Sequence, residues 1–279
     1  MALNMNFSVN ALGLMMDVSA RLMELKKWFE VYTHRFDSPV PAMQQGMDLK
    51  RDHTRRVCEN ILDIGRSLGL SQADLSIAEA AALLHDIGRF EQYRRYRTFS
   101  DHRSEDHAAL GVKVIEAEGI LAPFEPEIAG ILLRVVGYHN RAGLPEDEDQ
   151  RCLFFLKMVR DADKLDIWRV VTDYYRIAED HRNSTIELDL PDSPGISDPV
   201  YEALMQGRLV QMADLKTLND FKLLQMGWVY DLNFRRAFEL VREKGYLKML
   251  RDALPPNSSR AGDVYEKARA HLMRNASSF

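Results

Sequence analysis

The chain has 279 residues, enough to bury a sizeable core, and its 46% hydrophobic and 28% charged residues are ordinary for a globular protein. Its net charge of −5, with lysine and arginine spread along the chain, argues against a scaffold for nucleic-acid polymers or anionic membranes. The two cysteines, Cys58 and Cys152, form no paired motif, and we interpret them as buried free thiols in a reducing compartment.

The N-terminal stretch, residues 1–20, is partly apolar but lacks the basic start of a secretory signal peptide. No run in the chain approaches the ~18 consecutive apolar residues that are needed to span a bilayer. We therefore expect a soluble, cytoplasmic protein without a membrane partner.

Helical periodicity dominates the sequence, and no convincing series of alternating strands is present, so we predict an all-α fold. In the first two thirds of the chain, the predicted helices cover residues 17–35, 47–69, 72–88, 104–118, 127–139 and 151–181. Residues 89–103 are polar and aromatic without clear periodicity, which predicts a loop lying over its neighbours. Its aromatic residues Tyr93, Tyr96 and Phe99 would cover a site or stack on a base, or would simply anchor the loop.

The proline-rich stretch 182–199 is the best candidate for a domain boundary. Beyond it we predict helices at about 199–207, at 216–253 with an internal break, and at 262–274. The predicted organisation is therefore a helical core over residues 1–182 and a helical C-terminal extension over residues 183–279. The sequence leaves open whether the extension packs on the core, closes a pocket or forms a homodimer.

Several histidines and aspartates fall on the apolar faces of the predicted helices. His53, for example, precedes Val57 and Ile61 at helical spacing, so its side chain points inward with theirs. The polar residues that five helices turn toward the interior are His53, His85, Asp86, His107, His139 and Asp163. By contrast, His34, His181 and His271 lie in polar surroundings and are interpreted as surface residues.

A single buried histidine is most often a hydrogen-bonded core residue, because burying an unpartnered imidazole or carboxylate costs several kcal/mol. Six such groups in one chain are hard to explain in this way. A cation at their meeting point would satisfy all of them, since imidazole and carboxylate are ligands that divalent first-row metals accept. The pattern therefore predicts a metal site.

The order His53, His85-Asp86, Asp163, with the string HDIGR at residues 85–89, resembles the HD superfamily of metal-dependent phosphohydrolases over roughly residues 47–170. His107 and His139 are similar to the additional ligands of the subset with dinuclear centres. The resemblance implies an HD-domain helical bundle in which Asp86 bridges two metals. It further implies that one metal is bound by His53, His85 and Asp163, and the other by His107 and His139.

The resemblance also implies a mechanism in which two divalent cations activate a water molecule for attack on phosphorus. The ligand types suit Mn, Fe, Co, Ni or Zn, and Mg is also compatible. Arg89, directly after the HDIG string, and Lys164, beside Asp163, are candidates for binding the phosphate, with a surface salt bridge as the alternative for each. The expected partner is a small phosphorylated substrate such as a nucleotide.

The HD-GYP cyclic-dinucleotide phosphodiesterases carry a second histidine where this chain has Asn140, and their Gly-Tyr-Pro string is absent here, which argues against that substrate. Two other functions stay open. The first is a mixed-valent diiron oxygenase of the HD type, because the same ligand order occurs in those enzymes. The second is a regulatory domain that binds a metal or nucleotide without turnover, although the full set of ligands argues against it. The segment 227–234 (GWVYDLNF) resembles a bacterial subgroup of uncharacterised HD proteins, and no chemistry is assigned to it.

Overall fold

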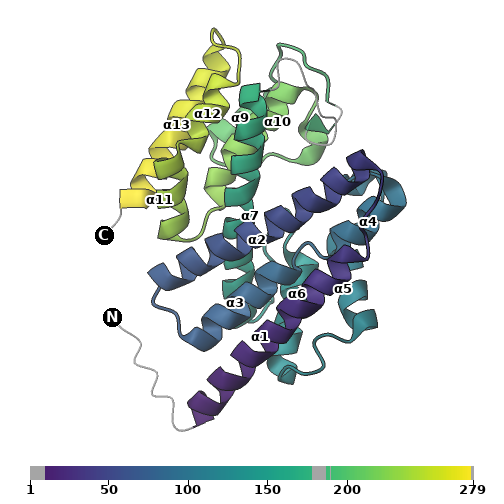
Figure 1. Ribbon diagram of the computed structural model, residues 1–279. Coiled ribbons are helices and arrows are strands. Elements are labelled where there is room, and N and C mark those ends of the chain that lie inside the picture. The colour runs from purple at the N-terminus through teal and green to yellow at the C-terminus, as the bar shows by residue number, and fades with distance from the viewer. Residues whose placement is uncertain (1–9, 178–186, 189, 278–279) are drawn as a thin grey trace. The chain divides into compact units, whose positions relative to one another are not determined.

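The computed structural model describes residues 10–177, 187–188 and 190–277, and within these ranges the chain is helical, with no β-strand (Figure 1). The α-helices are α1 (Asn10–His34), α2 (Pro41–Ser67), α3 (Gln72–Leu84), α4 (Gly88–Tyr96), α5 (His107–Glu118), α6 (Pro126–Tyr138), α7 (Gln150–Ile177), α9 (Asp198–Met205), α10 (Leu218–Gly227), α11 (Arg235–Lys244), α12 (Tyr246–Asp252) and α13 (Ser259–Ser277). Short 3-10 helices are η1 (Asp101–Arg103), η2 (Met212–Asp214) and η3 (Trp228–Asp231). The predicted all-α fold is confirmed.

Some helices begin at a different residue from the predicted one, because a proline or a capping side chain sets the start of the helix. Helix α2 begins at Pro41, six residues before the predicted start, because proline fits the first helical turn, where its missing N–H needs no partner. Helix α3 begins with Ser71 as its cap, whose side chain accepts a hydrogen bond from the backbone N–H of Asp74. The predicted end of α7, beyond Ile177, lies outside the described residues.

The predicted loop over residues 89–103 is wrong in its first half, because residues 89–96 belong to α4. This helix buries Phe90 and Gln92, and it ends at Tyr96. The cap residue that follows, Arg97, adopts a left-handed backbone with φ of 57°. The buried face of this helix includes a glutamine, so the apolar periodicity that indicates a helix is interrupted. The stretch 216–253, predicted with one internal break, is divided at both Leu232–Phe234 and Gly245.

The chain forms two compact units. The first comprises the described residues up to Arg97 together with Glu105–His139 and Pro145–Val159, and the second comprises Thr98–Ser104, Asn140–Leu144 and the described residues from Arg160 onward. The division falls within α7. The predicted domain boundary between residues 182 and 183 lies outside the described residues and stays a prediction.

In the first unit, α3 packs against α1, α2 and α6, and α4 packs against α2 and α5 (Figure 1). Helix α3 permits this close packing because its middle is a run of fully buried alanines, Ala78 and Ala80–Ala82. Phe90 of α4 meets Phe29 of α1 and Phe36 of the turn that follows α1, with ring centroids 6.0 and 5.9 Å apart. These contacts hold the first turn of α4, which begins at Gly88, the last residue of the HDIG string.

In the second unit, α13 packs against α9, α10, α11 and α12. A hydrophobic cluster forms around Leu218, Phe221 and Leu224 of α10. Trp168 of α7 is fully buried, and its indole N–H donates a hydrogen bond of 2.8 Å to the carbonyl oxygen of Gln225. Among the described residues, no helix combines the length and the apolar character that crossing a bilayer requires.

Candidate metal centre

The His85-Asp86 pair lies in a three-residue turn between the end of α3 and the start of α4. Gly88, the first residue of α4, packs against the first turn of α5. A Cβ atom at this position would lie 2.2 Å from the carbonyl oxygen of His107 and 2.5 Å from the nitrogen of Gly111, so only glycine fits. Because α5 begins at His107, this close approach brings the His107 side chain next to Asp86.

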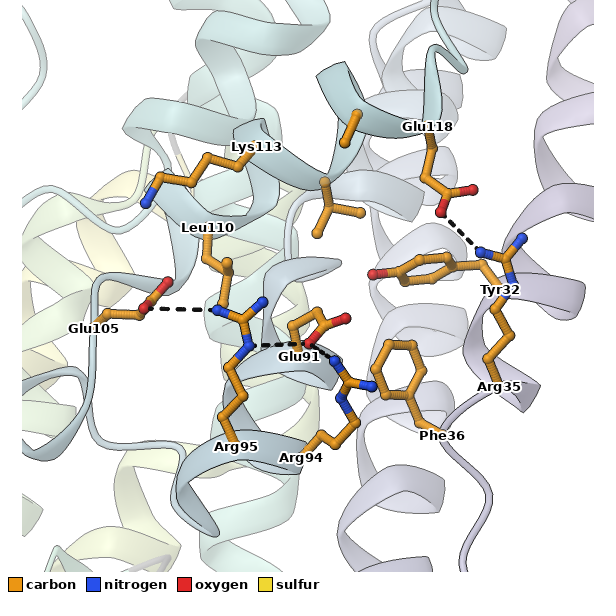
Figure 2. A pocket seen from close by; sticks show the side chains of 12 residues that line it. Tyr32, Arg35, Phe36, Glu91, Arg94, Arg95, Glu105, Leu110, Lys113 and Glu118 are labelled. Carbon is orange, nitrogen blue, oxygen red and sulfur yellow. Dashed lines mark hydrogen bonds and ion pairs between the residues drawn. The ribbon is translucent and has the colours of Figure 1, made fainter.

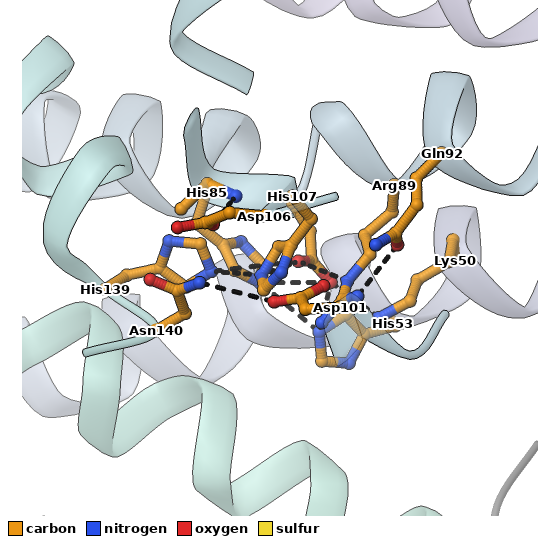
Figure 3. Close-up of polar contacts among 12 residues, drawn as sticks. Lys50, His53, His85, Arg89, Gln92, Asp101, Asp106, His107, His139 and Asn140 are labelled. Carbon is orange, nitrogen blue, oxygen red and sulfur yellow. Dashed lines mark hydrogen bonds and ion pairs between the residues drawn. The ribbon is translucent and has the colours of Figure 1, made fainter. Parts of the chain in front are cut away.

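Four histidines surround the Asp86 carboxylate in two pairs, one on each oxygen. Figure 3 shows these histidines, His53, His85, His107 and His139, gathered in one cluster. Oδ1 lies 3.3 Å from Nε2 of His107 and 3.8 Å from Nε2 of His139. Oδ2 lies 3.5 Å from Nε2 of His53 and 3.7 Å from Nε2 of His85. Within each pair the two Nε2 atoms are close together, 3.0 Å apart for His107 and His139 and 3.3 Å apart for His53 and His85.

Backbone carbonyl groups set the tautomer of one histidine in each pair. Nδ1 of His85 lies 2.7 Å from the carbonyl oxygen of Ala82, and Nδ1 of His139 lies 2.8 Å from that of Val136. Because a carbonyl oxygen only accepts, each Nδ1 is the donor, and in the neutral ring Nε2 is left with a lone pair. These lone pairs face the carboxylate, which is also an acceptor. A cation between them would turn this repulsion into coordination, so the donor set fits a metal.

The electrostatic surroundings keep Asp86 ionised. Burial alone would raise the pKa of its carboxyl, but the Lys50 ammonium at Oδ2 and the Arg89 guanidinium near Oδ1 counteract burial, and that pKa lies well below its usual value. The side chain of Asp86 is only 5% exposed. Asp86, His107 and His139 each offer one ligand atom, and these three atoms lie within 4.8 Å of one another. A single cation could therefore contact all three residues.

Two cationic side chains also reach Asp86. Nζ of Lys50 donates a hydrogen bond of 2.6 Å to Oδ2, and Nε of Arg89 lies 3.4 Å from Oδ1. Arg89 is held by Gln92, whose Oε1 accepts a hydrogen bond of 2.8 Å from Nη1, while Nε2 of Gln92 donates to the carbonyl oxygen of Glu105 at 2.9 Å. Arg89 is a candidate that the sequence pattern offers, and its phosphate-binding role stays a prediction, whereas the pattern gives no indication of Gln92. The available signal for Lys50 was its position three residues before His53, on the same face of α2.

Asp163 and Lys164 belong to the second unit. Asp163 is half-buried on α7, and its role as a metal ligand stays a prediction. Nζ of Lys164 lies 2.7 Å from Oδ2 of Asp231, and Nη2 of Arg160 lies 2.6 Å from the same oxygen. The Lys164 ammonium is buried in this ion pair, and its role in phosphate binding stays a prediction.

Other residues near the HDIG string have local structural roles. Oδ1 of Asp106 accepts hydrogen bonds from the backbone N–H groups of Ala108 (2.9 Å) and Ala109 (3.3 Å), so Asp106 caps α5. Two of the aromatic residues that the sequence analysis considered as a site cover contact the first unit. The hydroxyl of Tyr93 donates to the carbonyl oxygen of Ala42 at 3.3 Å, and that of Tyr96 donates to Oε2 of Glu105 at 3.1 Å. The anchoring interpretation is therefore the better one for both.

A separate pocket of about 480 Å³ lies among α1, α4 and α5 (Figure 2). Its rim carries ion pairs, including Arg35 with Glu118 at 2.8 Å and Arg94 with Glu91 at 2.7 Å. None of the six predicted metal ligands lines this pocket. We therefore do not assign this pocket to the metal centre.

The comparison with known proteins agrees with the geometry. The family model of the HD domain matches residues 51–168, a range that includes all six predicted ligands. No curated protein and no solved structure matches the chain. Residues 51–168 therefore form an HD domain, an all-helical domain of a superfamily of metal-dependent phosphohydrolases.

Proposed function

We propose that this protein is a metal-dependent phosphohydrolase that cleaves a nucleotide or another small phosphoester at a dinuclear centre. The observation that carries the proposal is the position of Asp86, whose two carboxylate oxygens each face a separate pair of histidine Nε2 atoms. A carboxylate placed in this way can bridge two cations, with two imidazole ligands for each of them.

The roles of the protein residues follow from their contacts. Asp86 would bridge the two cations, His53 and His85 would hold one, and His107 and His139 would hold the other. When bound, such a pair of divalent cations lowers the pKa of a water molecule and neutralises charge on the phosphoryl oxygens. The backbone carbonyls that accept from His85 and His139 would keep each Nε2 directed at its cation.

Arg89 is the residue that we assign to the substrate phosphate. Its guanidinium lies beside Asp86 and is held by the buried side chain of Gln92. A fixed guanidinium offers several N–H donors in one plane, which suits the oxygens of a phosphate group. We therefore expect Arg89 to orient the phosphoryl group and to stabilise the charge that develops on its oxygens during hydrolysis.

The test is phosphate release from a panel of nucleotides and small phosphoesters. Metal-stripped protein would be assayed after addition of Mn²⁺, Co²⁺, Ni²⁺, Mg²⁺ or Fe²⁺, beside Asp86→Ala and the matched variant Asp252→Ala. Asp252 is an exposed aspartate that forms an ion pair with Lys248 within the second unit. The proposal predicts metal-dependent turnover in the wild type and in Asp252→Ala, and none in Asp86→Ala.

Two other outcomes would replace the proposal. Absence of phosphate release together with two bound irons and oxygen consumption would identify a diiron oxygenase. Metal binding without phosphate release or oxygen consumption would identify a non-catalytic domain.

A further inference from the structure

Lys50 is the one residue in contact with Asp86, among those described above, that neither the HDIGR string (residues 85–89) nor the histidine pattern includes. It lies on α2 three residues before His53, just outside the matched range 51–168. Its ammonium donates to Oδ2 of Asp86 at 2.6 Å, the same oxygen that faces Nε2 of His53 and of His85. The Lys50 side chain is 15% exposed, so its ammonium lies at the margin of the buried cluster.

The position of Lys50 conflicts with coordination of a cation by Oδ2. Two positive charges within a few ångströms repel each other strongly where the surroundings are buried. A divalent cation on Oδ2 would therefore displace the ammonium. The lysine stem has four flexible carbons, so the displaced ammonium can turn aside while remaining close to the centre. Arg89 differs, because Gln92 fixes its guanidinium in place.

We infer that Lys50 is a mobile phosphate-binding residue that alternates between two anions. It neutralises the buried Asp86 carboxylate when no cation occupies Oδ2, and it turns to a phosphate oxygen of the substrate when a metal takes that position. Together with Arg89, it places a cationic side chain on each side of Asp86, at Oδ2 and Oδ1 respectively. This inference rests on the proposed phosphohydrolase function.

The experiment uses Lys50→Met, which removes the charge, and Lys50→Gln, which removes the charge but keeps a hydrogen-bond donor for Asp86. The matched control is Lys26→Met, because Lys26 also forms an ion pair within the first unit, with Glu79, and does not contact Asp86. Two quantities are measured by calorimetry on the full chain. They are the Kd of Mn²⁺ for metal-stripped protein and the Kd of inorganic phosphate for the Mn²⁺-loaded protein.

We expect both Lys50 variants to bind Mn²⁺ several-fold more tightly than the wild type, because a competing positive charge is gone. We expect their Kd for phosphate to rise about tenfold or more, the range for loss of a hydrogen bond to a charged group. Lys26→Met should match the wild type in both measurements. If Lys50→Met does not fold, Lys50→Gln supplies the same comparison.

The results that would overturn the inference differ from those that would overturn the proposed function. Unchanged phosphate affinity in the Lys50 variants, or weaker Mn²⁺ binding, would show that Lys50 is only a structural partner of Asp86. Wild-type protein that binds Mn²⁺ but neither binds phosphate nor hydrolyses phosphoesters would refute the phosphohydrolase, and the role of Lys50 with it.

Discussion

At the residue scale, each carboxylate oxygen of Asp86 faces its own pair of histidines, so the two proposed cation sites can be tested separately. His107 and His139 face Oδ1, whereas His53 and His85 face Oδ2. Removing one histidine should therefore empty one side and leave the other occupied. We expect His139→Ala to retain about one Mn²⁺ per chain where the wild type retains about two, because one imidazole ligand of two is lost on that side.

Elemental analysis of the desalted protein measures this stoichiometry. The exposed His34 supplies the control, since His34→Ala should retain the wild-type metal content. Loss of both metals in His139→Ala, or no loss at all, would contradict the assignment of one cation to each carboxylate oxygen.

Gly88 lets α4 approach α5 closely because it has no side chain. A Cβ atom there would overlap the carbonyl oxygen of His107, a backbone atom that cannot move without shifting α5. We expect Gly88→Ala to lower the free energy of unfolding by about 1–3 kcal/mol, the usual cost of overpacking, and to weaken metal binding because His107 moves. Chemical denaturation measures the first effect and Mn²⁺ titration the second.

The matched substitution is Gly262→Ala in α13. A Cβ atom at Gly262 would meet no atom within 4 Å, so alanine should stabilise the helix by about 0.5–1 kcal/mol. Equal effects of the two substitutions would contradict the packing argument for Gly88.

At the element scale, the structure gives the segment 227–234 a physical role that the sequence did not reveal. Asp231 binds Arg160 and Lys164 of α7. Oδ2 of Asp161 accepts hydrogen bonds of 2.9 Å from the backbone N–H groups of Asn233 and Phe234. The segment thus holds one turn of α7, within the second unit, in two ways. Asp231 pairs with two cations of α7, and the backbone at Asn233 and Phe234 binds the Asp161 carboxylate of α7. This turn includes Asp163, the last of the predicted ligands.

Asp231→Ala tests this role. The variant lacks the carboxylate that both buried cations contact, and breaking a buried pair is costly because the remaining charge stays desolvated. Removing one partner of a fully buried pair costs about 3–5 kcal/mol. Because the Asp231 side chain is 16% exposed, we expect the free energy of unfolding to fall by slightly less, about 2–4 kcal/mol. Asp252→Ala, which removes an exposed partner of Lys248, should cause no measurable loss in the same denaturation experiment. Similar stabilities of the two variants would contradict the role of Asp231 in holding Arg160 and Lys164 of α7.

The same scale shows what the sequence could and could not reveal. Helical periodicity indicated most of the helices and the inward faces of His53, His85, His107 and His139, because a helix repeats its apolar face in the local sequence. It failed for α4, where the buried Gln92 interrupts that face. It also failed for Lys50, because its partner Asp86 lies 36 residues away and only the packing of α2 beside α3 brings them together.

At the scale of the whole molecule, metal binding should be linked to folding. The four histidines and Asp86 come from α2, the turn after α3, α5 and the end of α6, so the site exists only when these elements are packed. A ligand that binds the folded form alone adds about 2.7 kcal/mol of stability at a hundred times its Kd. We expect Mn²⁺ to stabilise wild-type protein by about this amount and a chelator to reverse it. Asp86→Ala should show no such dependence, and its stabilisation by Mn²⁺ would place the metal elsewhere.

The most direct test of the account measures bound metal and phosphate release on the same sample. Metal-stripped protein would be titrated with Mn²⁺, and at each step the bound metal and the rate of phosphate release from the best substrate of the panel would be recorded. We expect activity to rise as the second Mn²⁺ binds, to a final content of two Mn²⁺ per chain. Full activity with no bound metal, or two bound metals with no hydrolysis of any phosphoester, would contradict this expectation.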